Sequence, residues 1–168
     1  MGKSRLEGKV ALITGGARGM GASEAQLFID EGARVVISDV LDSVGQETAK
    51  RLSPDGSKCV FLHHDVTSED DWTAVVASVL ETYGQIDILV NNAGIAGPVA
   101  EIVDITPEQW DEVFAVNVRS IYLMCRAFLP AMYRRGDGDV VNLASVSGKR
   151  PLAARTPYTA SKIAIIGL

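Results

Sequence analysis

Two side chains near the carboxyl end of the sequence, Tyr158 and Lys162, have types and spacing that would suit proton transfer. Residues four apart lie on one face of a helix, so the ammonium would sit beside the phenol. A phenol is mostly protonated at neutral pH, because its ordinary pKa is near 10. An ammonium about 4 Å away, at an effective dielectric near 20, stabilises the phenolate by about 4 kcal/mol. Such a pair would remove the hydroxyl proton of an alcohol.

A third side chain, the Ser145 hydroxyl, would complement that pair. It stands at the end of a predicted strand over residues 139–145, and ligands of open α/β sheets lie beyond the carboxyl ends of the strands. There it would donate a hydrogen bond to a substrate oxygen and stabilise developing alkoxide charge. On its own, a Tyr–Lys pair four residues apart is more often a plain pair on a helix surface. Its interpretation therefore depends on the rest of the sequence.

A glycine-rich segment near the amino end has the spacing of a phosphate-binding turn. It is Thr14-Gly15-Gly16-Ala17-Arg18-Gly19-Met20-Gly21, between an apolar run and a segment of helical period. Gly15 permits a tight turn, Gly19 lets the backbone approach a pyrophosphate, and Gly21 allows helix and strand to pack closely. The N–H groups and dipole of the helix start favour an anion. A purely structural turn is the alternative.

Asp39 ends the second predicted strand, where a dinucleotide fold places a carboxylate against the adenosine ribose. That carboxylate would accept hydrogen bonds from the ribose hydroxyls and would repel a 2′-phosphate. NAD is therefore expected in preference to NADP. Arg18 opposes this preference, because its guanidinium could pair with the 2′-phosphate, and Asp39 could also be an ordinary strand-end turn residue.

The elements that must position these side chains follow an alternating pattern. Short β-branched runs alternate with longer segments of helical period, as in βαβ units. The pattern predicts an α/β fold, a Rossmann-type doubly wound parallel sheet with helices on both faces. No linker, repeat or low-complexity tract marks a second domain, so residues 1–168 are expected to form one domain. The predicted strands are residues 9–14, 34–39, 58–64, 86–91 and 139–145.

Three helix starts carry recognisable signals. Ser68 and Asp71 are spaced as a capping box before an apolar stripe at positions 72, 75, 76, 79 and 80. The segment Thr106-Pro107-Glu108-Gln109 predicts an N-cap followed by a long helix towards Arg135. Thr156-Pro157 repeats that signal and opens the helix that carries Tyr158 and Lys162.

The motifs, in this order, resemble the short-chain dehydrogenase/reductase family over all 168 residues. The glycine segment is similar to the family's TGxxxGxG pattern. Asp65-Val66, after the third strand, looks like the pair that contacts adenine. Asn91-Asn92-Ala93-Gly94 resembles the family's NNAG turn, which steadies the central sheet and borders the nicotinamide-side ribose. Without the family, that segment is simply a strand-end turn.

The resemblance assigns catalytic roles to Ser145, Tyr158 and Lys162, with Asn117 as a fourth position. It implies an NAD-dependent oxidoreductase that transfers a hydride between NAD(H) and a secondary alcohol or ketone, with Tyr158 as the general acid/base. Lys162 would also bind the nicotinamide ribose. Asn117 would distort its helix so that a main-chain carbonyl holds a water in a relay to Lys162. It could also be an ordinary surface residue of the helix without a functional role. Ala144 replaces a serine common in the family.

The cofactor contacts that these arguments and the resemblance imply form one set. They are Gly15, Arg18, Gly19, Met20, Gly21, Asp39, Val40, Asp65, Val66, Asn92, Ala93, Gly94, Tyr158 and Lys162.

Composition excludes some classes of function. The net charge of −5, with basic residues dispersed among acidic ones, argues against a nucleic-acid-binding protein. The apolar run at Val10–Ile13 is too short for a signal peptide or membrane span, so a cytoplasmic protein with no membrane association is expected. Cys59 and Cys125 stand among apolar residues and are expected to be buried free thiols.

Other side chains are interpreted as structural. His63 and His64 are adjacent on a strand, so they point to opposite faces and cannot ligate one metal together; no metal site is expected. Trp72 and Trp110 lie among apolar neighbours and are interpreted as core anchors. The acidic run Glu69-Asp70-Asp71 fits the first turn of a helix.

The sequence departs from the family at its end, because Leu168 falls inside the predicted helix that begins near Pro157. Members of the family continue with further strands, a substrate lid and dimer-forming elements, so residues 139–145 are expected to form a sheet edge. The alternative function is therefore a nucleotide-binding or dimer-forming fragment without turnover. The glycine loop resembles those of hydroxysteroid and alicyclic alcohol dehydrogenases, which favours a cyclic or steroid-like substrate, and the family implies a homodimer or homotetramer.

Overall fold

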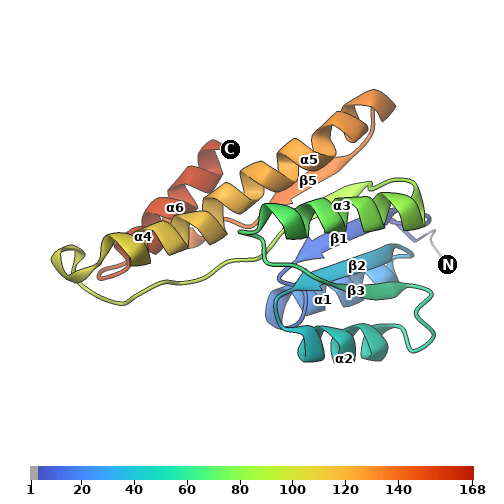
Figure 1. Cartoon of the computed structure of the whole chain (residues 1–168), viewed down its shortest axis with the longest axis horizontal. Helices are drawn as coiled ribbons and strands as arrows, with labels where there is room; N and C mark the ends of the chain where they lie inside the picture. The colour runs from blue at the N-terminus through green and yellow to red at the C-terminus, as the bar shows by residue number, and fades with distance from the viewer. Residues whose placement is uncertain (1–3) are drawn as a thin grey trace.

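The computed structural model describes residues 4–168 and has a parallel sheet at its centre with helices around it (Figure 1). The strands are β1 (Val10–Thr14), β2 (Arg34–Asp39), β3 (Cys59–His63), β4 (Ile88–Asn91) and β5 (Asp139–Asn142). The α-helices are α1 (Gly19–Asp30), α2 (Asp42–Leu52), α3 (Glu69–Tyr83), α4 (Pro107–Phe114), α5 (Ser120–Arg135) and α6 (Thr156–Gly167). Shorter turns are the 3-10 helices η1 (Ile102–Asp104) and η3 (Val146–Gly148), and the π-helix η2 (Ala115–Arg119).

The sheet has the strand order β3-β2-β1-β4-β5, and every pair of neighbouring strands is parallel. The chain therefore starts in the middle, builds outward to β3, and returns to build the other half. This is the topology of a doubly wound Rossmann-type sheet, which confirms the predicted fold class. Within residues 4–168, β5 is an edge strand, as expected from the sequence.

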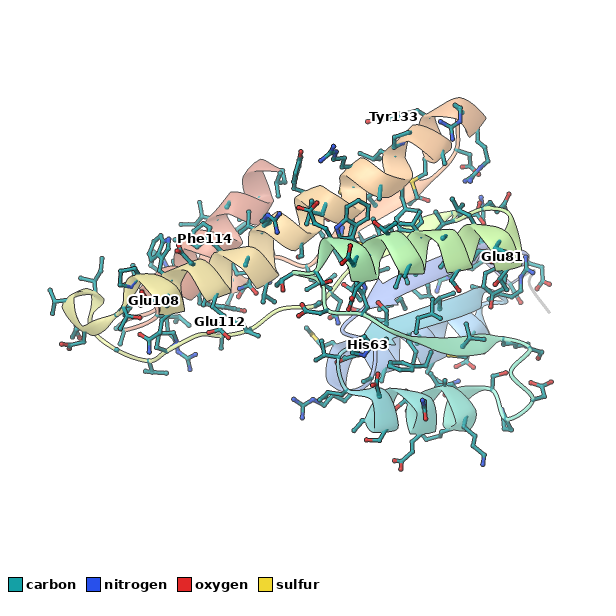
Figure 2. All side chains as sticks on the ribbon, in the orientation of Figure 1. His63, Glu81, Glu108, Glu112, Phe114 and Tyr133 are labelled. Carbon is teal, nitrogen blue, oxygen red and sulfur yellow. The ribbon has the colours of Figure 1, made fainter. Side chains whose placement is uncertain are left out.

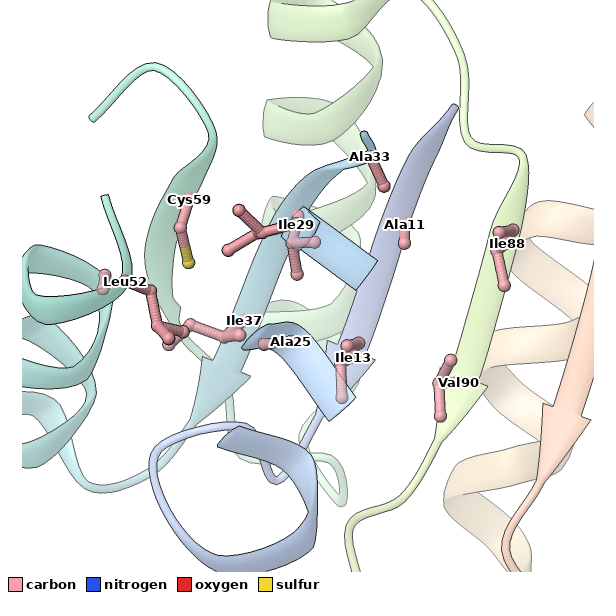
Figure 3. Packing of buried hydrophobic residues seen from close by; sticks show 12 residues of the cluster. Ala11, Ile13, Ala25, Ile29, Ala33, Ile37, Leu52, Cys59, Ile88 and Val90 are labelled. Carbon is pink, nitrogen blue, oxygen red and sulfur yellow. The ribbon is translucent and has the colours of Figure 1, made fainter. Parts of the chain in front are cut away.

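Alternate residues of the buried strands supply two separate cores, one on each face of the sheet. Ala11 and Ile13 of β1 pack on one face with Ile29 of α1 and with α2 (Figure 3). Leu12, between them, packs on the other face with α3 and with Phe128 of α5. Both faces are thus covered, which explains why the strands read as continuous apolar runs rather than as alternating ones.

Helices α4 and α6 lie beyond the end of the sheet rather than over its faces (Figure 1). They pack against each other, and α6 also packs against η2 and η3. Helix α6 carries Tyr158 and Lys162, so these two predicted site residues lie beyond the end of the sheet.

Several predicted strand boundaries are too wide. The strand expected over 139–145 ends at Asn142, because the N–H of Ala144 turns back to the carbonyl of Asn142 at 3.1 Å. Ser145 therefore lies after the strand rather than in it. The strand expected from residue 86 begins at Ile88, and those expected over 9–14 and 58–64 each lose terminal residues, while Arg34–Asp39 is confirmed.

All three predicted helix starts are confirmed, but the N-cap of the third differs from the expected one. Ser68 caps α3 by accepting from the N–H of Asp71, and the acidic run fills the first turn. Thr106 and Gln109 form a complete capping box at α4. Helix α6 begins at Thr156 as predicted, but Arg155 rather than Thr156 is its N-cap, and no side chain makes a capping bond there.

The long helix predicted from residue 107 to Arg135 is continuous in direction but changes its winding. The π-helix Ala115–Arg119 separates α4 from α5. By length and composition alone the whole run Pro107–Arg135 could cross a membrane. Core helices share that composition, and Phe128 and Met132 are buried against the sheet, so core packing accounts for these apolar residues.

The structural roles predicted for the cysteines and tryptophans are confirmed only in part. Cys59 is a buried free thiol in the core, whereas Cys125 is a free thiol that is only half-buried. Trp72 packs against the core between α3 and the sheet. Trp110 does not belong to either core cluster; it stacks on Phe114 of α4 with ring centroids 4.9 Å apart, so its interpretation as a core anchor is wrong.

Candidate active site

A pocket of about 480 Å³ lies where the carboxyl ends of the central strands meet the start of α1. This is the position at which doubly wound sheets bind ligands, and the volume lies within the range of small-molecule sites. Eleven of the expected cofactor contacts line it: Gly15, Arg18, Gly19, Met20, Asp39, Val40, Asp65, Val66, Asn92, Ala93 and Gly94. Of the expected contacts, Gly21, Tyr158 and Lys162 do not line it.

The glycine loop has the backbone that a phosphate cradle requires. Gly15 and Gly19 adopt left-handed conformations with φ of +66° and +60°. A Cβ on Gly15 would lie 2.8 Å from the Cα of Ala93, so the loop and the turn after β4 approach too closely for any side chain. A Cβ on Gly21 would overlap the carbonyl oxygen of Gly15. Gly21 therefore acts through packing, as predicted, rather than by lining the pocket.

The start of α1 presents its first N–H groups to the pocket. In the described part of the chain, no side chain caps this helix at Arg18, in contrast to the capped starts of α3 and α4. Uncapped N–H groups at a helix start, reinforced by the helix dipole, form an anion site. The geometry thus fits a phosphate or pyrophosphate group.

Asn92 ties this loop to the end of β4. Its Nδ2 donates to the carbonyls of Thr14 and Gly15 at 2.9 and 3.1 Å. The backbone N–H groups of Asn92 and Ala93 donate to the Thr14 hydroxyl at 3.2 and 3.1 Å. The turn after β4 therefore holds the glycine loop in place, which agrees with the steadying role that the family resemblance implies for it.

Two carboxylates lie at the ends of neighbouring strands along one side of the pocket. Asp39 is the last residue of β2 and accepts from the N–H groups of Ala17 and Leu41, each at 3.2 Å. Asp65, beyond the end of β3, accepts from the N–H and hydroxyl of Thr67 at 2.9 and 2.8 Å. Both carboxylates are therefore fixed by the backbone next to them. They can accept hydrogen bonds from hydroxyl or amino groups of a ligand.

Asn117 lies in the π-helix and is completely buried. Its side-chain amide makes a double link to Ile95, accepting from the N–H at 2.8 Å and donating to the carbonyl at 2.9 Å. Nδ2 also donates to the Ser161 hydroxyl at 3.0 Å, and that hydroxyl donates to the carbonyl of Tyr158 at 2.7 Å. The expected distortion of the helix at Asn117 is present, and this side chain connects the pocket wall to the helix that carries Tyr158.

Lys162 is buried on α6, and its ammonium donates to the carbonyl of Leu143 at 2.6 Å. Nζ lies 5.7 Å from the centre of the Tyr158 ring, so the two side chains share one face of the helix as predicted. Burial lowers the pKa of the lysine ammonium. A Cβ on Gly94 would lie 3.6 Å from Nζ and 3.2 Å from Oδ1 of Asn117, so these residues converge at the end of the pocket.

Ser145 is the N-cap of η3, where its hydroxyl accepts from the N–H of Ser147 at 3.1 Å. Ser145 was expected at the end of the strand, but β5 ends at Asn142 and a short turn separates the two residues. However, η3 packs against α6, and a Cβ on Gly148 would lie 2.7 Å from the carbonyl oxygen of Lys162. The segment with Ser145 is thus held close to the helix that carries Tyr158 and Lys162.

Some residues of this region were not predicted from the sequence to belong to the site. Leu41, His64, Ile95 and Val116 also line the pocket, and Ser161 and Gly148 join its supporting elements. His64 is buried, whereas His63 is exposed between α2 and α3, near Asp42 and Asp71 (Figure 2). The two histidines therefore diverge as predicted. No grouping of three or more potential metal ligands occurs within residues 4–168.

Comparison with known proteins agrees with this geometry. A family model described as short chain dehydrogenase matches residues 9–168. A solved metagenomic short-chain oxidoreductase in complex with NADP superposes with a TM-score of 0.91 at 35% identity, covering 96% of this chain and 73% of that chain.

Curated relatives include several named dehydrogenases. Zerumbone synthase of Zingiber zerumbet is 46% identical over 98% of this chain and 61% of its own length. The 3-beta-hydroxysteroid dehydrogenase of Comamonas testosteroni is 40% identical over 98% of this chain and 63% of its length. Cyclopentanol dehydrogenase of Comamonas sp. is 39% identical over 96% of this chain and 64% of its length. The chain thus spans less than two thirds of these relatives.

Proposed function

The chain belongs to the short-chain dehydrogenase family, and from that premise we propose that it is an oxidoreductase that transfers a hydride between NAD(H) and a secondary alcohol or ketone. The observation that supports this most strongly is the convergence of Gly94, Asn117 and Lys162 at the end of the pocket. A cofactor-sized pocket and a Tyr–Lys pair thereby become parts of one site.

The residues present fit a nicotinamide dinucleotide. The uncapped start of α1 and the left-handed Gly15 and Gly19 suit the pyrophosphate, and Asp39 and Asp65 suit the adenosine. When bound, the cofactor would supply the group that accepts or donates the hydride. Gly94 and Lys162 would border its nicotinamide end.

NAD is proposed in preference to NADP because of Asp39. Its carboxylate lies in the pocket lining, where it would accept from the ribose hydroxyls and repel a 2′-phosphate. Arg18 lines the same part of the pocket and would attract that phosphate. A solved short-chain oxidoreductase with a similar fold contains NADP, so the balance between these two side chains decides the preference.

Tyr158 is proposed as the general acid/base. It would take the hydroxyl proton during alcohol oxidation and return it during ketone reduction. Lys162, held by the Leu143 carbonyl beside the phenol, would stabilise the phenolate by its positive charge. Ser145 would donate to the substrate oxygen, because η3 places it beside α6. Asn117 would hold the end of the pocket and the start of α6 in register.

A cyclic or steroid-like alcohol is proposed as the substrate class. Relatives at 39–40% identity are named as acting on a hydroxysteroid and on cyclopentanol. A homodimer or homotetramer, which the family resemblance implies, and a cytoplasmic location are proposed along with it.

The exposed edge of the sheet favours a second function, in which the chain binds nucleotide or a second copy without turnover. The β5 edge and α6 expose Val141, Ile163 and Ile166, each between 44% and 51% accessible. Unpaired strand edges invite pairing with another chain. In that case the cofactor pocket would function without the chemistry at Tyr158.

One experiment separates the two functions. NADH binding is titrated by fluorescence, and NADH formation is then followed with cyclopentanol and with a 3-hydroxysteroid, for the unaltered chain and for Tyr158→Phe. The proposed function predicts that both proteins bind NADH within about twofold and that the variant loses about 100- to 10,000-fold in kcat. If the unaltered chain binds NADH but shows no more turnover than Tyr158→Phe, the second function is supported.

A further inference from the structure

His64 occupies a place in the cofactor pocket that the proposed function does not use. It follows β3 directly, lines the pocket and is only 1% exposed. Its Nδ1 lies 3.0 Å from the hydroxyl of Ser38, which is itself fully buried in β2. The other ring nitrogen, Nε2, is buried and has no hydrogen-bond partner within residues 4–168.

The two bonded side chains each precede a pocket carboxylate. Ser38 comes before Asp39 in β2, and His64 comes before Asp65 after β3. The backbone ladder between the strands already continues to this level, since the N–H of His64 donates to the carbonyl of Asp39 at 3.0 Å. The Ser38–His64 bond adds a second, side-chain link at the same level. Together these bonds fix the separation of the two carboxylates.

If the His64 imidazole only filled space in the core, burying it would cost free energy. A serine hydroxyl and a neutral imidazole carry two polar hydrogens between them but make one bond here, so one hydrogen has no acceptor in the part of the chain described. Burial lowers the pKa of His64 to about 4, so the ring is neutral near pH 7. An apolar side chain of similar size would avoid the unmatched group. What the imidazole adds is the bond to Ser38.

We propose that His64, through its bond to Ser38, is a positioning residue for the adenosine half of the cofactor, holding Asp39 and Asp65 at the spacing that adenosine requires. This inference rests on the proposed function, because it assumes a dinucleotide in the pocket. It concerns affinity for adenosine and leaves the hydride-transfer chemistry at Tyr158 untouched. The position of His64 at the ends of β2 and β3, away from α6, separates the two effects.

The test measures binding of NADH and of AMP to the unaltered chain and to His64→Leu, with AMP followed by competition against NADH. AMP contains the adenosine half alone. Losing one buried hydrogen bond is expected to raise the dissociation constants of NADH and AMP alike, by about tenfold. With NAD saturating, kcat is expected to change by less than about twofold. Equal affinity of His64→Leu and the unaltered chain for both ligands would overturn the inference.

Three further variants make the test specific. His64→Asn keeps a side-chain amide near the position of Nδ1 and is expected to recover affinity to within about threefold of the unaltered chain. Ser38→Ala removes the hydroxyl but keeps the ring, so it decides the question if His64→Leu fails to fold. It is expected to weaken AMP binding as His64→Leu does. His63→Leu, at the exposed neighbouring histidine, is the matched control and is expected to bind both ligands normally.

The inference and the proposed function fail differently. If the unaltered chain does not bind NADH, the proposed function is wrong and the inference falls with it. If the unaltered chain binds NADH and AMP, and Ser38→Ala binds both equally well, only the role of His64 is wrong. A loss of NADH affinity in His64→Leu without any loss of AMP affinity would also contradict a role in positioning adenosine.

Discussion

Gly148 of η3 lies directly against the backbone of α6 at Lys162: a Cβ on this glycine would stand 2.7 Å from the lysine carbonyl oxygen. No real Cβ lies that close to backbone, so the glycine sets how near the Ser145 segment comes to the helix with the Tyr–Lys pair. The contact links the proposed hydrogen-bond donor to the proposed acid/base. The missing side chain at residue 148 is thus part of the geometry of the site.

Replacing this glycine should impair catalysis more than cofactor binding. In Gly148→Ala, η3 and α6 must move apart by about half an ångström or more, because the Lys162 carbonyl oxygen would lie 2.7 Å from the new methyl group. Misplacing reacting groups by about 1 Å costs about 100-fold in rate, so a decrease of about tenfold in kcat is expected. The Kd for NADH should change by less than about threefold, since the pocket lining is not displaced. Steady-state kinetics and NADH titration measure the two effects.

The control for that variant is Gly167→Ala, also associated with α6. A Cβ there meets nothing within 4 Å. This substitution should leave kcat and the midpoint of thermal unfolding unchanged, whereas a kcat loss equal to that of Gly148→Ala would show that contact with η3 is not the cause.

The Ser161 hydroxyl is expected to position Tyr158. It accepts from Asn117 and donates to the Tyr158 carbonyl, so Ser161→Ala leaves a buried amide hydrogen unsatisfied and frees the first turn of α6. The cost to stability should be about 1–3 kcal/mol, with a clear fall in kcat and an unchanged Kd for NADH. Urea unfolding and steady-state kinetics test this.

Thr159 offers a matched comparison on the same helix. Its hydroxyl is buried without a hydrogen-bond partner in the described chain, so Thr159→Val removes an oxygen that makes no bond. That variant should be as stable as the unaltered chain or more stable, with its kcat preserved. If both variants lost the same activity, the Ser161 bonds would not be the reason.

Cofactor preference should shift when the Asp39 carboxylate is removed. Asp39→Ser deletes the charge that would repel a 2′-phosphate while Arg18 remains in the pocket lining to attract it. NADPH should then bind at least about tenfold more tightly relative to NADH than it does to the unaltered chain. Asp65→Asn is the comparison, because it should weaken both cofactors by the same factor. Parallel fluorescence titrations give the ratio directly.

Much of this site could be predicted because its groups are encoded locally. Glycine spacing, strand-end carboxylates and the Tyr158–Lys162 interval each depend on a few consecutive residues. The N-cap of α3 and the capping box of α4 could also be predicted, since a hydroxyl and an acidic or amide side chain three residues later form a local unit. The fold class followed from the alternation of such units and was confirmed.

The rest depends on contacts between segments far apart in the sequence. Helix α2 has Leu41 as its N-cap and no side-chain capping bond, so the sequence gives no capping signal from which its start could be predicted. The strand expected to reach Ser145 ends early because of a tight turn that apolar pattern does not encode. His64 and Gly148 gain their meaning only from Ser38 and Lys162. Periodicity cannot reveal such pairs.

At the opposite end of the strands, Asp87 is expected to be important for stability alone. Its carboxylate, 2% exposed, accepts from the N–H of Val10 at 2.8 Å, from Arg135 at 3.2 Å and from Gln85. Asp87→Ala would leave a half-buried guanidinium and a strand N–H without this acceptor, at a cost of about 3 kcal/mol. Urea unfolding should show that loss, with kcat unchanged at a temperature where the variant is folded. Asp139→Ala, at an exposed carboxylate nearby, should cost less than about 0.5 kcal/mol.

Stability should fall on mild acidification because of His64. Burial lowers its folded-state pKa from 6.5 to about 4, so the unfolded chain binds a proton first as pH falls. The stability that comes from keeping this ring neutral is therefore fully present above about pH 6.5 and is lost progressively towards pH 4, by about 3 kcal/mol in total. Urea unfolding at pH 7.5, 6.0 and 5.0 measures the loss, and His64→Asn should show a much flatter pH dependence. The exposed His63, whose pKa the side chain of Asp42 raises, contributes in the opposite direction but is present in both proteins, so the comparison cancels it. Identical pH dependence in the two proteins would mean that the ring is not held neutral in the folded chain.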